Sequence, residues 1–175
     1  MTDKPPHRRH HAPAMKIIRL LLCTTALATA EAPNPKIDFD HFARLTGELA
    51  QLRESRRVSE DEFLRLANEP GTVILDARSP EKYRQLHVKG AVHLNFADFT
   101  EASLATVIPT KTTRVLIYCN NNFEGAPNLF PSKVIALNLP TFLTLHGHGY
   151  TEVHELGPLL DIAKTKIPFA GDSVK

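Results

Sequence analysis

The sequence predicts an α/β fold with helices on both faces of a central, mostly parallel sheet. Residues 72–75 and 114–118 form continuous β-branched and apolar runs, which is typical of strands buried on both sides. Segments with helical signals separate the two runs, and this alternation of strand and helix favours parallel pairing. With 175 residues and 42% hydrophobic side chains, the chain has the size and composition of one domain with a substantial core.

Two helices are predicted before the first buried strand. From Asp38 to Arg57, apolar residues recur at helical spacing and the other positions are charged, so we expect this helix to pack one stripe against the domain. The sequence Ser-Glu-Asp-Glu at 59–62 has the pattern of a capping box, which predicts the start of a second, short helix. The turn residues at 68–71 end it.

The remaining elements follow in chain order. Ser79 before Pro80 predicts a helix that begins there and runs to about Leu86, because serine caps helices and proline suits the first helical position. No clear period runs through 120–133, which we interpret as a long ordered loop. The other expected elements are a strand at 91–94, a helix at 98–108, a helix from Pro140 to His146 and a last strand at 152–156.

Residues 1–30 have the pattern of a targeting segment. They carry a net charge of about +4, and the apolar run at 20–28 is too short to cross a bilayer as a helix. Small residues at 28–30 have the spacing that a signal peptidase reads. We therefore expect a periplasmic or secreted protein with no stable membrane insertion after leader removal; an uncleaved leader that anchors the protein in a membrane is the alternative.

The predicted organisation has four parts: a leader at 1–30, a linker and N-terminal helix at 31–57, the domain at 58–165 and a C-terminal tail at 166–175. Without the leader, the chain carries a net charge of about −2. A slightly acidic body lacks the basic stripe that binds a phosphate backbone, so we expect no nucleic-acid partner.

Cysteine usage singles out one thiol. Cys23 falls in the predicted leader, so the mature chain would retain Cys119 alone and form no internal disulfide. A lone thiol in an oxidising compartment is either buried and inert or reactive. Cys119 follows a buried strand, at the end of the sheet where α/β folds bind ligands, and this position favours a functional thiol.

Several separated motifs resemble the signature of rhodanese-like domains. A strand ends in Asp76-x-Arg78, the sequence His-x-x-Gly-Ala at 87–91 leads into the next strand, and the strand at 116–118 leads to Cys119. The resemblance covers roughly residues 58–160 and implies a single three-layer domain of rhodanese-like fold.

In that family the cysteine opens a loop of backbone N–H groups that leads into a helix, and it carries sulfane sulfur as a persulfide. Such N–H groups and a helix N-terminus favour a thiolate and bind an anionic donor. The resemblance therefore implies Cys119 as the catalytic residue and no cofactor. The substrate-binding loop it implies consists of Asn120, Asn121, Asn122, Phe123, Glu124 and Gly125.

This sequence departs from the family pattern in the loop. Glu124 adds negative charge there, which we expect to weaken attraction for a doubly charged donor. The stretch from Pro127 to Pro131, with Leu129 and Phe130, has the pattern of an insertion that forms a lid or a surface for a protein partner.

Several other residues have two interpretations each. We expect Asp76 and Arg78 to brace the structure as an ion pair rather than to act in catalysis, and His87 to stabilise a turn rather than to assist proton transfer. Phe123 either walls the pocket or anchors the loop, and the three asparagines either donate to a ligand or shape the turn. The histidines lack the spacing of a zinc site, so we expect no metal.

Three functions are compatible with these residues. The first is a sulfurtransferase or sulfane-sulfur carrier acting through Cys119, with a small sulfur donor and a thiol acceptor. The second is a catalytically silent binding module for a partner protein or a small metabolite. The third, a cysteine phosphatase, shares the fold but needs an arginine six positions after the cysteine, where this chain has Gly125.

Overall fold

The computed structural model describes residues 34–174. The chain divides into two compact units, Met1–Ile37 and Asp38–Lys175. In the described part of the first unit, the Ile37 N–H donates to the Asn34 carbonyl at 3.0 Å. The helices and strands of the described residues all belong to the second unit. The predicted leader at 1–30 lies outside the described residues.

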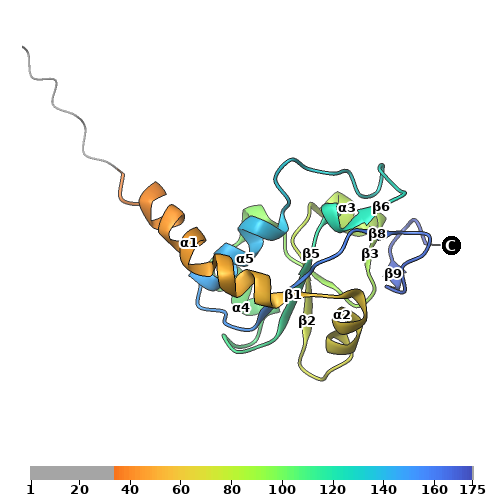
Figure 1. The fold of residues 1–175 in the computed structure, drawn as a ribbon, viewed down its shortest axis with the longest axis horizontal. Helices are drawn as coiled ribbons and strands as arrows, with labels where there is room; N and C mark the ends of the chain where they lie inside the picture. Colours follow the sequence, from red (N-terminus) through yellow and green to blue (C-terminus); the bar gives the residue numbers. More distant parts are fainter. Residues whose placement is uncertain (1–33, 175) are drawn as a thin grey trace, which may run out of the picture. The chain divides into compact units, whose positions relative to one another are not determined.

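A five-stranded parallel sheet forms the centre of the second unit (Figure 1). Its strand order is β1-β7-β5-β2-β4, so β5 is the middle strand, with β2 on one side and β7 on the other. All four strand pairs are parallel, as the continuous apolar runs predicted. The strands are β1 (Arg57–Val58), β2 (Val73–Asp76), β4 (Val92–His93), β5 (Val115–Tyr118) and β7 (Val153–Leu156).

Helices cover both faces of this sheet, which makes three layers. Side chains of β5 alternate between the faces: Leu116 and Tyr118 pack in one core cluster, and Val115 and Ile117 pack in the other. The first cluster lies under α2 (Glu60–Ala67) and α3 (Pro80–Gln85). The second lies under α1 (Phe39–Arg56), α4 (Glu101–Val107) and α5 (Asn138–Gly147). The α/β class and the three-layer architecture are therefore confirmed.

Helix starts follow the signals in the sequence closely. Ser59 and Ser79 are the N-caps of α2 and α3, and each side chain accepts a hydrogen bond from a backbone N–H three residues later. The expected reciprocal half of the capping box is absent from α2, because the Glu62 carboxylate accepts from Arg65 instead. The N-terminal helix packs through Leu49 and Leu52 while Phe39 and Phe42 stay exposed.

Two predicted boundaries differ in the structure. Helix α5 begins at Asn138, two residues before Pro140, because proline is tolerated throughout a first turn whose N–H groups have no intrahelical acceptor. Residues 120–133 are not wholly loop. They contain a 3-10 turn, Asn120–Asn122, and a short strand β6 (Phe123–Glu124) that pairs with β8 (Leu160–Asp161), a pairing too short to leave a period.

The segment predicted as a C-terminal tail is part of the domain. Strand β9 (Phe169–Ala170) pairs with β3 (His87–Val88), and Ile167 is buried in the core. Gly171 has a φ of 122°, and a Cβ there would lie 2.7 Å from the Gln85 carbonyl oxygen, so the segment approaches α3 too closely for any other residue. The short apolar stretch around 167–169 carries no period, which is why the sequence did not predict it as structured.

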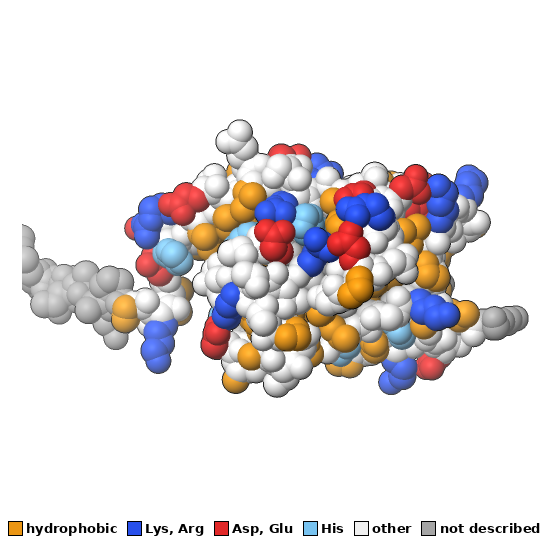
Figure 2. Space-filling view, turned by 90° about the horizontal axis from the view of Figure 1, so that it is seen from below, with side chains coloured by type: hydrophobic (Ala, Val, Ile, Leu, Met, Phe, Trp, Pro, Cys, Tyr) orange, Lys and Arg blue, Asp and Glu red, His pale blue; other side chains and the backbone are white. Residues whose placement is uncertain are grey.

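Charged side chains of both signs lie side by side on the surface (Figure 2). Exposed pairs such as Arg65 with Glu62 and Lys111 with Glu101 illustrate this pairing, and such solvent-screened pairs contribute little to stability. Within residues 34–174, no helix combines the length and the hydropathy that a membrane span requires.

Candidate functional site

The thiol of Cys119 sits directly after β5, the middle strand of the sheet. Its side chain is 1% exposed, and it forms part of the floor of a pocket of about 350 Å³. A pocket of this size accommodates a small anion or part of a larger ligand. The lining residues are Arg78, Ser79, Lys82, Cys119, Asn120, Asn121, Pro131, Lys133, Ile135 and Leu137.

Three of the lining side chains are cationic. Arg78, Lys82 and Lys133 bring positive charge to the pocket, whereas no acidic side chain lines it. Glu124 lies outside it, so our expectation that this carboxylate weakens attraction for an anionic donor finds no support in the geometry. The pocket is suited to anions because the positive charge of these side chains raises the local concentration of negatively charged ligands.

Backbone amides surround the sulfur. N–H groups of Asn138, Asn121 and Leu137 hydrogen-bond to the thiol, and each lowers its pKa. Leu137 and Asn138 form the N-terminus of α5, so a helix end points at the sulfur although residues 120–136 separate Cys119 from Leu137.

Burial nevertheless dominates the ionisation of this thiol. Removal from water raises the pKa of Cys119 above its ordinary value, the amides oppose this, and the negative charge of Glu155 raises it further. We expected the converging amides to favour the thiolate; the amides are present, but their effect is smaller than that of burial. At neutral pH the sulfur is therefore mainly a neutral thiol.

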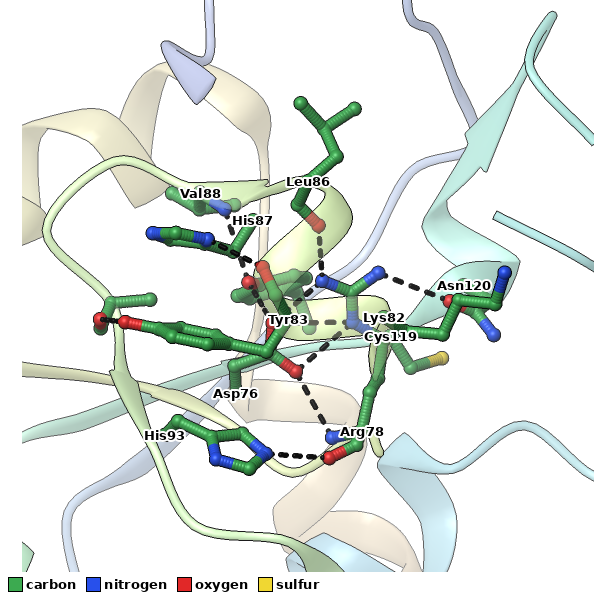
Figure 3. Close-up of polar contacts among 12 residues, drawn as sticks. Asp76, Arg78, Lys82, Tyr83, Leu86, His87, Val88, His93, Cys119 and Asn120 are labelled. Atoms are coloured by element: carbon green, nitrogen blue, oxygen red, sulfur yellow. Dashed lines mark hydrogen bonds and ion pairs between the residues drawn. The ribbon is translucent and has the colours of Figure 1, made fainter. Parts of the chain in front are cut away.

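Asp76 and Arg78 form the predicted ion pair beneath the pocket. Asp76 ends β2, and its Oδ2 accepts from Arg78 Nη2 at 2.6 Å in a fully buried position. The same guanidinium donates to the Leu86 carbonyl at 2.7 Å and to Asn120 Oδ1 at 3.2 Å (Figure 3). Arg78 therefore connects the end of β2, the end of α3 and the start of the cysteine loop.

His87 lies away from the thiol. Its ring stacks on Tyr83 with centroids 3.9 Å apart, and Nδ1 is 2.7 Å from the Tyr83 carbonyl oxygen (Figure 3). The residue does not line the Cys119 pocket. These contacts agree with a histidine that stabilises the turn between α3 and β3.

The three asparagines of the loop occupy different places. Asn120 and Asn121 line the pocket, whereas the buried Asn122 lies behind it. Asn122 Oδ1 accepts from the Cys119 N–H at 2.9 Å, and its Nδ2 donates to the Leu156 carbonyl at 2.7 Å. Asn121 binds the backbone of Lys133 with both ends of its amide, at 2.7 and 3.0 Å. Asn121 and Asn122 thus shape the loop, the second of the two readings.

The last three loop residues implied by the resemblance do not reach the pocket. Phe123 is buried in the core, where its ring packs 4.5 Å from that of Phe130. Glu124 continues strand β6, and Gly125 follows with a φ of 85°, where a Cβ would lie 3.2 Å from an Asp161 carboxylate oxygen. Phe123 therefore anchors the loop and Gly125 permits the turn after it.

Part of the expected partner surface at 127–131 packs inward. Phe130 is 2% exposed and belongs to the core, and Leu129 packs against it, whereas residues 127–128 are exposed. A substitution at Phe130 therefore changes stability first. Two exposed apolar residues, Val134 and Ile135, follow this stretch, and Ile135 lines the Cys119 pocket.

Sequence reasoning missed the residues that α5 and β7 bring to the sulfur. Glu155 is 5% exposed and its Oε1 accepts from Arg53 Nη2 at 2.7 Å and from Asn138 Nδ2 at 3.3 Å. Lys82 and Lys133 come from α3 and from the segment before α5. One signal was available for Glu155, because a carboxylate inside a predicted buried strand needs a partner. Within residues 34–174, no group of three or more potential metal ligands lies together.

The family model described as Rhodanese-like domain matches residues 59–156. The chain is 33% identical to Thiosulfate sulfurtransferase PspE of Escherichia coli (strain K12) over 93 residues, which are 53% of this chain and 76% of that protein.

Solved structures with a similar fold include a rhodanese with anions from E. coli, 26% identical with a TM-score of 0.40, covering 57% of this chain and 98% of that one. Another is the BH2092 protein of Bacillus halodurans, 16% identical with a TM-score of 0.49, covering 80% of this chain and 88% of that one.

Proposed function

This chain belongs to the rhodanese-like domain family, and from that premise we propose that it is a sulfurtransferase or sulfane-sulfur carrier in which Cys119 is the nucleophile. The observation that carries the proposal is the position of the sulfur. It lies at the floor of a pocket lined by three cations, and it accepts hydrogen bonds from the N-terminus of a ten-residue helix. The relative named as a thiosulfate sulfurtransferase adds support.

The chemistry consists of two displacements at sulfur. The Cys119 thiolate attacks the outer sulfur of an anionic donor such as thiosulfate; the donor S–S bond breaks, and sulfite leaves with the bonding electrons. A persulfide remains on Cys119. An acceptor thiolate then attacks the terminal sulfur, and the Cys119 thiolate is released with the electrons of that bond.

The lining residues have distinct parts in these steps. Lys82 and Lys133 favour entry of the anionic donor, because they carry positive charge at the pocket. The amides of Asn121, Leu137 and Asn138 stabilise negative charge on the Cys119 sulfur when it forms and when it is released. The thiol must lose its proton before the first attack, so the raised pKa makes deprotonation part of the cost of the first step.

Intact-mass measurement tests the proposal directly. Full-length protein is incubated with thiosulfate or a polysulfide, and we expect one additional sulfur atom that is absent from Cys119→Ser and is removed by an added thiol. Cys23→Ser is the matched control, since it removes the other cysteine of the chain. Lack of added sulfur, with the Cys119 thiol shown to be free, contradicts the proposal.

A second candidate function is a silent binding module for a small anionic metabolite. The observation that favours it is the raised pKa of Cys119, because a neutral thiol is a weak nucleophile. The Cys119→Ser variant distinguishes the two functions. Anion binding is expected to persist in this variant under either function, whereas a sulfur-transfer activity that disappears in it identifies an enzyme.

The site of action is proposed to be the periplasm or the outside of the cell. The basic residues, short apolar run and small residues of 1–30 support export. N-terminal sequencing of protein recovered from the cell envelope tests this. A chain that begins after residue 30 is expected, whereas a chain that retains the apolar run indicates a membrane anchor.

A further inference from the structure

A buried chain of polar contacts links helix α1 to the reactive sulfur. Arg53 of α1 donates through Nη2 to Glu155 Oε1 of β7 at 2.7 Å. Asn138 Nδ2 reaches the same carboxylate oxygen at 3.3 Å, and the backbone N–H of Asn138 binds the Cys119 thiol. Three contacts thus connect a side chain outside the family-matched residues 59–156 to the nucleophile.

The same asparagine also holds the cysteine loop. Asn138 Nδ2 donates to Asn122 Oδ1 at 3.0 Å, and that oxygen accepts from the Cys119 N–H at 2.9 Å. A shift of the Glu155 carboxylate therefore moves the Asn138 side chain, and with it both the loop and the helix end that face the sulfur.

The charges in this chain oppose each other at the thiol. Glu155 disfavours the Cys119 thiolate, whereas Arg53 lies beside that carboxylate and offsets its charge. The side chains of Glu155 and Arg53 are 6% and 21% exposed, so solvent screens them incompletely. The pair therefore acts on the sulfur both by position and by charge.

From these contacts we propose that Arg53 is a positioning residue for the Cys119 thiolate, which it reaches through Glu155 and Asn138. The inference rests on the proposed function, since a thiolate has to form for sulfur transfer. Through this contact the N-terminal helix affects the chemistry. Arg53 of α1 supplies the positive charge that balances the buried Glu155 carboxylate near the nucleophile.

Other charged groups lie around this pair. Glu54, the next residue of α1, places its Oε1 3.5 Å from Arg53 Nη1 and also accepts from Arg57. Arg57 of β1, the register neighbour of Glu155, binds Glu54 and the Gly157 carbonyl. Asn138 and Thr141 of α5 are neutral. The remaining charges near the pair or the thiol are the Arg56–Glu152–His154 cluster and the pocket cations Arg78, Lys82 and Lys133.

Arg56 provides a matched control. It lies on the same helix, it pairs with the carboxylate just before the same strand (Glu152, 3.0 Å), and its side chain is 24% exposed, close to the 21% of Arg53. It makes no hydrogen bond to Asn138, and its removal deletes the same charge from α1. Any effect of Arg53→Met beyond that of Arg56→Met therefore reports the link through Glu155.

The test is the pKa of Cys119, measured from the pH dependence of alkylation by iodoacetamide and of thiolate absorbance in full-length Cys23→Ser protein. Arg53→Met is expected to raise the pKa by about one unit, roughly tenfold less thiolate at neutral pH, and Glu155→Gln to lower it by a similar amount. Arg53→Lys keeps the charge and is expected to retain most of the effect of arginine. The double variant is expected to return close to the unsubstituted value.

A merely structural pair gives a different result. If Arg53→Met shifts the thiol pKa no further than Arg56→Met, or if Arg53→Met and Glu155→Gln shift it in the same direction, the proposal is overturned. Should Arg53→Met fail to fold, Arg53→Gln takes its place, because it also removes the charge, and the same two comparisons decide the question. Alkylation needs no sulfur donor, so a failed link is distinguishable from a failed sulfurtransferase.

Discussion

Two buried carboxylates flank β5, and they differ in how completely they are hydrogen-bonded. Asp76 of β2 stands in register with Tyr118, and its oxygens accept from the Arg78 backbone and guanidinium and from the Tyr118 hydroxyl. Glu155 of β7 stands in register with Ile117, and its two donors, Arg53 and Asn138, both reach Oε1. Among the described residues, nothing donates to its Oε2.

The difference separates structural support from control of the thiol. A carboxylate saturated by one arginine and a tyrosine fixes its surroundings, because removing any donor leaves a buried charge unpaired. A carboxylate held at one oxygen is easier to replace. Its charge also raises the pKa of Cys119, whereas Asp76 is not among the groups that shift this thiol.

Arg78→Met is expected to have the largest effect on stability. It leaves Asp76 charged and buried without its guanidinium, and the cost is about 3–5 kcal/mol of unfolding free energy. Urea denaturation followed by circular dichroism measures it. Exposed Arg65→Met, which breaks two solvent-screened surface pairs, is the control and is expected to lower the free energy of unfolding far less. A cost for Arg78→Met as small as that of the control would contradict the comparison.

Phe130→Ala is expected to follow closely, since it empties a ring position in the core between Phe123 and Phe169. The loss is about 3–4 kcal/mol, whereas Ile135→Ala in the same segment, whose side chain is exposed, changes stability by under about 0.5 kcal/mol. Thermal and urea unfolding of both variants measure the difference. Equal losses would mean that the segment is not anchored through Phe130.

Glu155→Gln is expected to destabilise the fold less than Arg78→Met. The amide retains an oxygen for Asn138 and Arg53, and Arg53 is partly exposed and keeps its contact with Glu54, so the cost is about 1–2 kcal/mol. The same urea titration measures it. A loss as large as that of Arg78→Met would remove the distinction between the two carboxylates.

Two histidines, His154 of β7 and His146 of α5, also predict a small dependence of the free energy of unfolding on pH. Burial, and then the charge of Arg56, lower the pKa of both His154 and His146. Because the folded-state pKa lies below the unfolded value of about 6.5, the contribution is full above that pH and is lost as pH falls through the folded pKa. The urea midpoint is therefore expected to be lower at pH 5.5 than at pH 7.5. This decrease is expected to be smaller in His154→Gln. Equal midpoints would contradict this.

The sequence predicted the parts of the site that local patterns encode. Ser59 and Ser79 cap helices because their hydroxyls face free N–H groups, and the strand before Cys119 is a continuous apolar run. The resemblance supplied the Asp76–Arg78 pair. The pattern gave no sign that α5 returns to the sulfur after the segment at 123–137, because that contact is long-range and depends on Phe130 and Asn121 holding the segment.

The thiol environment was the least predictable feature. The sum of burial, three amides and one carboxylate decides the ionisation of Cys119, and of these only the Asn121 amide belongs to the loop that follows the cysteine in sequence. The implied loop was too wide for the same reason: Phe123 and Gly125 follow the cysteine in sequence, but the chain turns them toward the core and toward β8.

The most direct test of the account is the rate of sulfur loading on Cys119 as a function of pH, measured by intact mass after short exposure to thiosulfate. We predict a single added sulfur, located on Cys119, with a rate that rises with pH and reaches half its maximum above the ordinary cysteine value of about 8.5. A rate that is independent of pH, or loading that persists in Cys119→Ser, would contradict a buried, amide-ringed nucleophile at this position.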